Sequence, residues 1–221
     1  MALASIQPGG ARPVLGDLIG PDAGVARLLK QAALLVAGVA AMWISAKVQL
    51  GTVPVPITLQ VLVTMVIGAA YGPVLGMATI AAYLGLGAEG LPVFAGTPEK
   101  GIGMAYMMGP TGGYLLGFLL AAGTVGALAR AGWDRSVASM AGAMAIGLVV
   151  MYVPGVVWLC AGLSLFGTVA AGAGAEVFAG YGWENWYSYG VRTFLWVDAL
   201  KLVVAVLAFP AIWRLVGDAR V

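Results

Sequence analysis

Residues 48–88 read VQLGTVPVPITLQVLVTMVIGAAYGPVLGMATIAAYLGLGA and contain no charged side chain. This run is long enough for two membrane-spanning helices, since one helix needs about 20 apolar residues. The Gly72-Pro73 pair divides the run, because proline lacks the backbone donor that a helix interior requires and restricts the residue before it. We therefore expect two short helices, over residues 57–72 and 73–88, joined by a tight turn.

The rest of the chain repeats this pattern of long uncharged stretches between charged residues. Of its 221 residues, 62% are hydrophobic and 9% are charged, whereas soluble domains carry about a quarter charged residues. Lipid must therefore be the solvent for most of the chain, which excludes a soluble enzyme, a nucleic-acid-binding protein and a disordered chain. The expected transmembrane helices cover residues 29–47, 57–72, 73–88, 111–129, 137–166 and 191–214.

The predicted fold class is therefore all-α, a polytopic integral membrane protein with six transmembrane helices. We expect one transmembrane domain over residues 27–221. Residues 1–26 lack an apolar stretch of useful length and are interpreted as a short cytoplasmic leader. Lys and Arg favour the loops on the N-terminal side of the membrane by seven to three. Because cytoplasmic loops are enriched in these residues, both termini are expected in the cytoplasm of a cell (inner) membrane.

The composition also excludes several kinds of chemistry. The chain has no histidine and one cysteine, so neither a Cys/His metal site nor a disulfide framework is expected. No Gly-Lys-Ser or Gly-Lys-Thr sequence occurs, so the chain lacks the P-loop that many ATPases use. A net charge of +2 is too small to indicate a nucleic-acid partner. We expect no metal and no cofactor.

Two opposite charges interrupt the last apolar stretch. Counted from Arg192, Asp198 lies about 9 Å and Lys201 about 13–14 Å along a helix. Each charge costs at least a few kcal/mol in the membrane unless it is paired or solvated. Three residues apart, the two side chains share one helix face. They form either a structural ion pair or a polar pocket for a solute that carries both N–H and C=O groups, such as an amide or urea.

Further candidates for a binding site lie in the loops and at the helix ends. Lys100, in a loop rich in Gly and Pro, is either an exposed charge or the partner of an anionic ligand group. Gln60 follows the Val-Pro-Val-Pro stretch, where it either binds a ligand or bonds between helices. Tyr114 opens a helix behind two glycines and can stack on a ligand, although tight helix packing explains the same glycines. Three residues are candidates for an apolar wall: Phe94, Tyr106 and Trp196.

A stripe of small residues marks the first helix. Ala33, Ala37 and Ala41 repeat at four-residue spacing, so they lie on one face. Small residues allow another helix to approach closely. The stripe therefore predicts a helix contact, either within the chain or with a partner subunit.

Four motifs occur in an order that resembles the BioY family, the biotin-specific substrate-binding (S) components of energy-coupling factor (ECF) transporters. The resemblance spans about residues 27–214. Its most specific part is the Gly-Pro-Thr-Gly-Gly-Tyr block. The motifs are Val53-Pro-Val-Pro-Ile-Thr-Leu-Gln60, Gly90-Leu-Pro-Val-Phe-Ala-Gly96, Gly109-Pro-Thr-Gly-Gly-Tyr-Leu-Leu-Gly-Phe118 and Asp198-x-x-Lys201.

The resemblance implies an S component that captures biotin from outside and is not itself an enzyme. By this resemblance, Asp198 and Lys201 engage the ureido ring, and Lys100 is the basic residue near the valerate carboxylate. The alanine stripe would then contact the transmembrane coupling subunit. ATP would be hydrolysed by separate ABC-type ATPase subunits.

Other functions remain compatible with the residues alone. One is an S component for a different small vitamin. Another is an intramembrane enzyme that uses Asp198 and Lys201 as acid and base, although no nucleophile or metal cluster joins them. The remaining alternatives are a passive channel and a structural membrane subunit.

Overall fold

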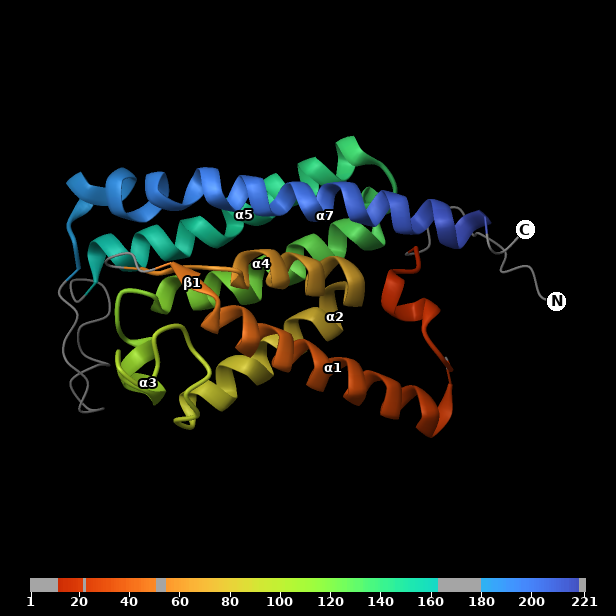
Figure 1. The fold of residues 1–221 in the computed structure, drawn as a ribbon, viewed down its shortest axis with the longest axis horizontal. Coiled ribbons are helices and arrows are strands. Elements are labelled where there is room, and N and C mark those ends of the chain that lie inside the picture. The colour runs from red at the N-terminus through yellow and green to blue at the C-terminus, as the bar shows by residue number, and fades with distance from the viewer. Residues whose placement is uncertain (1–11, 22, 51–54, 163–179, 219–221) are drawn as a thin grey trace.

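The computed structural model describes residues 12–21, 23–50, 55–162 and 180–218. The fold is all-α, as predicted. Within the described ranges, five helices are long and apolar enough to cross a membrane, and they pack side by side in an elongated bundle (Figure 1). These helices are α1 (Gly24–Lys47), α2 (Gln60–Ala88), α4 (Gly112–Arg130), α5 (Val137–Ala161) and α7 (Thr193–Asp218).

Short elements connect the long helices. A two-stranded antiparallel ribbon pairs β1 with β2 between α1 and α2. Among the described residues, the short helices are one α-helix, three 3-10 helices and one π-helical turn. The short elements are η1 (Leu15–Leu18), β1 (Gln49–Leu50), β2 (Ile57–Thr58), α3 (Gly103–Met107), η2 (Trp133–Arg135), η4 (Trp183–Asn185) and η5 (Ser188–Arg192).

Helix α2 is two helices that fold back on each other at Gly72. This residue has φ 77° and ψ 178°, a conformation that glycine adopts and other residues rarely do. A Cβ atom on Gly76 would lie 3.3 Å from the Cα atom of Gly68, so the two halves are in direct contact. With this division the described residues form the six long helices expected from the sequence. The break at Gly72-Pro73 is confirmed, and Figure 1 shows the resulting V shape.

Glycine allows α4 to pack closely against both of its neighbours. A Cβ atom on Gly117 would lie 2.4 Å from the carbonyl oxygen of Met151, in α5. On the other side, a Cβ on Gly68 of α2 would lie 2.6 Å from the carbonyl oxygen of Ala122. Small residues of this kind let membrane helices pack backbone to backbone. Helix α4 is accordingly the central helix, whereas α1 is largely exposed.

Residues 12–21, which belong to the expected leader, lie against the bundle. Asp17 forms an ion pair with Arg130 at the end of α4, and the backbone N–H of Arg12 donates to the Arg130 carbonyl at 2.8 Å. Val14 is fully buried. The division of the chain into a leader and one domain stays a prediction. Several helix boundaries differ from those expected: α1 begins at Gly24, α2 begins at Gln60 after strand β2, and α7 covers Thr193–Asp218. Residues 163–166 of the expected 137–166 segment lie outside the described ranges.

Candidate functional site

A pocket lies where the ends of several helices meet the β1–β2 ribbon and the loop after α2. It contains about 500 Å³ of empty space, including the part that opens to solvent. Its wall is mostly apolar and aromatic, with a few polar groups, as is usual for small-molecule sites. The lining residues are Val55, Pro56, Ile57, Thr58, Gln60, Val61, Ala95, Tyr106, Thr111, Tyr114, Leu115, Phe118, Met151, Tyr152, Phe194 and Asp198.

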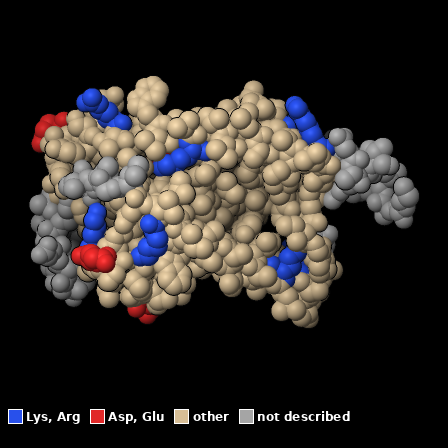
Figure 2. All heavy atoms as spheres, in the orientation of Figure 1, with Lys and Arg blue, Asp and Glu red and all other residues tan. Residues whose placement is uncertain are grey.

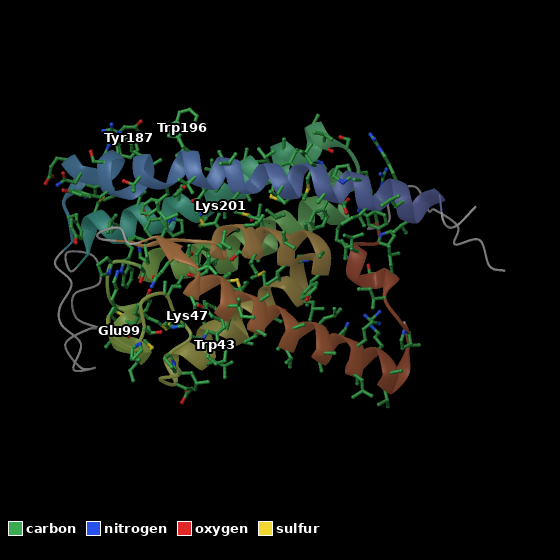
Figure 3. The ribbon with its side chains drawn as sticks, viewed as in Figure 1. Trp43, Lys47, Glu99, Tyr187, Trp196 and Lys201 are labelled. Atoms are coloured by element: carbon green, nitrogen blue, oxygen red, sulfur yellow. The ribbon has the colours of Figure 1, made fainter. Side chains whose placement is uncertain are left out.

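Asp198 is the charged residue of this wall, and it is 2% exposed. Its Oδ1 atom accepts a hydrogen bond from the Lys201 ammonium at 2.8 Å, and its Oδ2 atom accepts one from the Tyr152 hydroxyl at 2.8 Å. Lys201 also donates to the Thr58 carbonyl at 2.6 Å. The structure therefore brings the predicted pair together, with Lys201 pointing from α7 into the bundle (Figure 3).

This network leaves hydrogen-bonding capacity for a ligand. An ionised carboxylate has about four acceptor sites and an ammonium has three donors. The contacts to Lys201 and Tyr152 occupy two acceptor sites of Asp198. Two of the three Lys201 donors are engaged, by Asp198 and Thr58. A solute with N–H and C=O groups can therefore bind here without first breaking the ion pair.

Gln60 lines the pocket from the first turn of α2 and is held in place by polar neighbours. Its Nε2 atom donates to the Tyr83 hydroxyl at 2.9 Å, and its Oε1 atom accepts from the Thr58 hydroxyl at 3.2 Å. Tyr83 in turn donates to the Val93 carbonyl at 3.0 Å. These bonds connect the ribbon before α2 to the loop after it, so the position of Gln60 depends on both segments that cover the pocket.

Tyr114 also lines the pocket, from the start of α4. Its hydroxyl donates to the Gly190 carbonyl at 2.7 Å. Its ring lies directly on Gly155 of α5, where a Cβ atom would come within 2.4 Å of the ring. A Cβ on Gly113 would lie 2.3 Å from the Pro154 carbonyl oxygen. The glycines before Tyr114 therefore serve tight helix packing, and that packing sets the position of the tyrosine.

Phe94 does not line the pocket. It is fully buried between Tyr83 and Tyr106, with ring centroids 5.5 Å and 4.9 Å away. Gly87 provides the space, because a Cβ there would lie 2.0 Å from the Phe94 ring. Tyr106 and Ala95 form the wall instead. Phe94 thus anchors the loop from behind, a position that sequence spacing could not distinguish from the wall itself.

Lys100 is exposed and is not among the lining residues. In the part of the chain that the structure describes, its ammonium has no hydrogen-bond or ion-pair partner. Lys47, which was not a candidate, is the cation that holds this loop. Its ammonium donates to the carbonyl of Phe94 and to the carbonyl and hydroxyl of Thr97, each at 3.0 Å. Figure 3 shows Lys47 at the end of α1 beside the loop.

Several other residues differ from expectation. Trp196, a candidate for the wall, points away from the bundle and is 79% exposed (Figure 3). Tyr152 was not a candidate, because its position opposite Asp198 depends on how α5 packs against α7. Four further wall residues were not candidates either, since in sequence they are ordinary members of apolar helices: Leu115, Phe118, Met151 and Phe194.

The alanine stripe lies on the outer face of α1. Ala33 and Ala37 are exposed and Ala41 is half-buried. The neighbouring Gly38 faces inward instead, where a Cβ would lie 2.5 Å from the Thr79 side chain. Within the described structure, packing inside the chain therefore does not bury the stripe.

Membrane helices around a small, partly charged pocket define a solute-binding integral membrane protein. The family model described as BioY family matches residues 20–218. The chain belongs to the BioY family.

Individual relatives agree with this assignment. The biotin transporter BioY of Thermotoga maritima is 38% identical over 175 residues, which cover 79% of this chain and 86% of the relative. The probable biotin transporter BioY of Pyrococcus horikoshii is 39% identical over 130 residues, or 59% of this chain and 74% of that one. The crystal structure of an S-component for biotin from an ECF-type ABC transporter has a similar fold. Its TM-score is 0.66 at 22% identity, and the match covers 87% of this chain and 95% of that one.

Proposed function

We propose that this protein captures biotin at the outer face of the cytoplasmic membrane, as the substrate-binding component of an ATP-driven ECF transporter. The observation that carries the proposal is the buried Asp198–Lys201 pair, whose carboxylate lies at the wall of a pocket lined mostly by apolar and aromatic side chains. Membership of the BioY family and the names of its relatives support biotin as the substrate. ATP hydrolysis belongs to separate ABC-type ATPases.

The chemistry of the pocket matches the three parts of biotin. The ureido N–H groups donate to the remaining acceptor sites of Asp198, and the ureido oxygen accepts from Lys201. The fused rings pack on Tyr114, Phe118 and neighbouring apolar side chains, while Gln60 lines the polar side. The valerate carboxylate extends toward the loop that follows α2, where Lys100 is an exposed cation.

The distribution of basic residues supports the proposed orientation. Residues 12–21 and the end of α7 lie at the end of the bundle opposite the β1–β2 ribbon (Figure 1), whose strand β2 lines the pocket. Arg27, Arg130 and Arg214 belong to helix ends on that side. Because Lys and Arg concentrate on the cytoplasmic side, both termini are cytoplasmic and the pocket opens outward.

The alanine stripe is proposed as the contact with the transmembrane coupling subunit. Exposed small residues on a membrane helix allow a second helix to approach closely. Ala33 and Ala37 present such a surface. Substitution of Ala37 by a large residue should therefore impair assembly while leaving biotin binding by the isolated protein intact.

Calorimetric titration of the purified protein with biotin and with a panel of other vitamins tests the proposed substrate. We expect tight binding of biotin and none of the unrelated vitamins. Asp198→Asn and Lys201→Ala should each weaken biotin binding about a hundredfold, because each leaves a buried charge without its partner. Trp196→Phe, on the exposed face of the same helix, is the matched control. Unchanged binding in both variants would remove the proposed site, and tighter binding of another vitamin would replace biotin as the substrate.

A further inference from the structure

A second, larger cavity lies at the end of the bundle opposite the pocket. It contains about 1760 Å³ of empty space, including its open part. Four segments enclose it: residues 13–18, the first turns of α1, the turn and second half of α2, and the end of α4. Figure 2 shows the surface hollowed at this end, with a basic side chain beside the hollow. None of its lining residues belongs to the biotin pocket.

The lining of this cavity is positively charged. Arg27, Lys30 and Arg130 contribute three cations, whereas Asp17 is the one carboxylate among the described lining residues. Asp17 is already committed, because it pairs with Arg130 and also accepts a hydrogen bond from the Val14 backbone N–H at 3.0 Å. By formal charge, the described lining therefore has three cations and one carboxylate, a composition that favours an anion.

Along α1, the charged lining residues lie nearer the helix end than the aliphatic one. Arg27, Lys30 and Leu34 follow one another at three- and four-residue spacing, so they lie on one face of α1. Leu34 is seven residues beyond Arg27, about 10 Å further along the helix. Leu75 and Ala78 of α2 also line the cavity. On α1, two cations thus lie near the helix end, and Leu34 lies nearer the middle of the membrane.

This order matches an acidic phospholipid better than a soluble anion. A free phosphate uses the cations alone and leaves the aliphatic part of the cavity without a function. A phospholipid places its charged headgroup at the helix ends and its acyl chain deeper, as the lining does. Basic pockets between transmembrane helices are known to bind acidic headgroups, and each Lys or Arg near the surface contributes about 1 kcal/mol to attraction for acidic lipids.

We propose that this cavity is a binding site for one acidic phospholipid, whose headgroup phosphate lies between Arg27, Lys30 and Arg130 and whose acyl chain packs against Leu34 and Leu75. The site belongs to the leaflet on the side of the termini. Lipid binding at this site requires a membrane but not biotin. The proposal can therefore be tested independently of the proposed transport function.

Native mass spectrometry of the purified full chain tests the site with phosphatidylglycerol and phosphatidylcholine as probes. We expect one phosphatidylglycerol to remain bound under conditions that remove phosphatidylcholine. The double variant Arg27→Gln/Lys30→Gln should bind phosphatidylglycerol about tenfold more weakly, since two of three cations are lost. Arg214→Gln removes a cation that is outside the lining, and it should retain the lipid. Unchanged biotin binding by both variants shows that they are folded.

Three results would overturn the proposal. The first is equal retention of the two lipids by the unmodified protein. The second is displacement of phosphatidylglycerol by millimolar inorganic phosphate or glycerol 3-phosphate, which would identify a soluble anion as the ligand. The third is a double variant that keeps its lipid selectivity but no longer assembles with the coupling subunit, which would make the cavity a protein-docking surface.

Discussion

Lys47 donates two hydrogen bonds to Thr97, one to its carbonyl oxygen and one to its hydroxyl, each at 3.0 Å. A third bond reaches the Phe94 carbonyl, so all three donors of the ammonium are used. The end of α1 is thereby attached to the loop whose Ala95 forms part of the pocket wall. The ammonium of Lys47 is hydrogen-bonded to this loop, whereas Lys100 is an exposed residue of the loop.

Substituting these two lysines separates loop order from charge recognition. Lys47→Met should weaken biotin and its uncharged carboxamide equally, by about tenfold, because it releases the loop. Lys100→Met should weaken biotin by roughly fivefold and leave the carboxamide unaffected, since an exposed ion pair contributes little. Titration of each variant with both ligands measures the difference. Equal losses for both ligands in Lys100→Met would remove this residue as the carboxylate partner.

Tyr152→Phe should reduce biotin affinity about tenfold without unfolding the protein. The substitution removes the hydroxyl that donates to Asp198 at 2.8 Å, and hydrogen bonds to charged groups contribute about 1.5–3 kcal/mol. Tyr187→Phe, at an exposed tyrosine, controls for loss of a hydroxyl. Affinities measured by titration should decrease in the order wild type, Tyr152→Phe, Asp198→Asn. Wild-type affinity in Tyr152→Phe would show that Asp198 is oriented by Lys201 alone.

Gly155→Ala should lower biotin affinity through Tyr114. The added methyl group would lie 2.4 Å from the Tyr114 ring, so the ring must move relative to the pocket. Gly85→Ala is the matched control, because nothing lies within 4 Å of its added methyl group and alanine favours helix over glycine by about 1 kcal/mol. Binding and thermal unfolding of the two variants check this. A reduced affinity in Gly85→Ala would contradict the assigned role of Tyr114. An unchanged affinity in Gly155→Ala would contradict it as well.

Asp134 predicts a pH dependence of stability. Burial raises the pKa of this carboxyl above its ordinary value, although a hydrogen bond from Trp213 and the charge of Arg135 oppose the shift. The folded protein therefore holds this proton more tightly than the unfolded chain. The contribution of this tighter proton binding to folding stability has its full value below about pH 4, the ordinary pKa of aspartate. It is lost as the pH rises through the raised pKa.

Thermal unfolding in detergent between pH 4 and pH 7 measures this contribution. Asp134→Asn should flatten the pH dependence, because the amide oxygen still accepts from Trp213 but no longer titrates. Asp134→Ala should unfold at a lower temperature at every pH, since the Trp213 N–H then lacks the acceptor that it has now and an unsatisfied buried donor costs about 1–3 kcal/mol. An unchanged slope in Asp134→Asn assigns the pH dependence to another group.

Local chemistry in the sequence predicted the fold and part of the site. The Gly72-Pro73 break follows from the properties of these two residues, and buried charge alone marked Asp198 and Lys201. The rest depends on contacts between distant segments. Tyr152 is 46 residues from Asp198, and Lys47 is 50 residues from Thr97. No short-range pattern could therefore predict these pairs, or distinguish a wall residue such as Tyr106 from Phe94 behind it.

The reversal of α2 at Gly72 has an effect on the opposite end of the molecule. One arm of the V begins at Gln60, and the other leads to the loop that carries Ala95. The angle at Gly72 therefore contributes to the separation of two segments of the pocket wall. Changes at this vertex would alter how readily a solute enters or escapes, while every atom that touches the solute stays chemically the same.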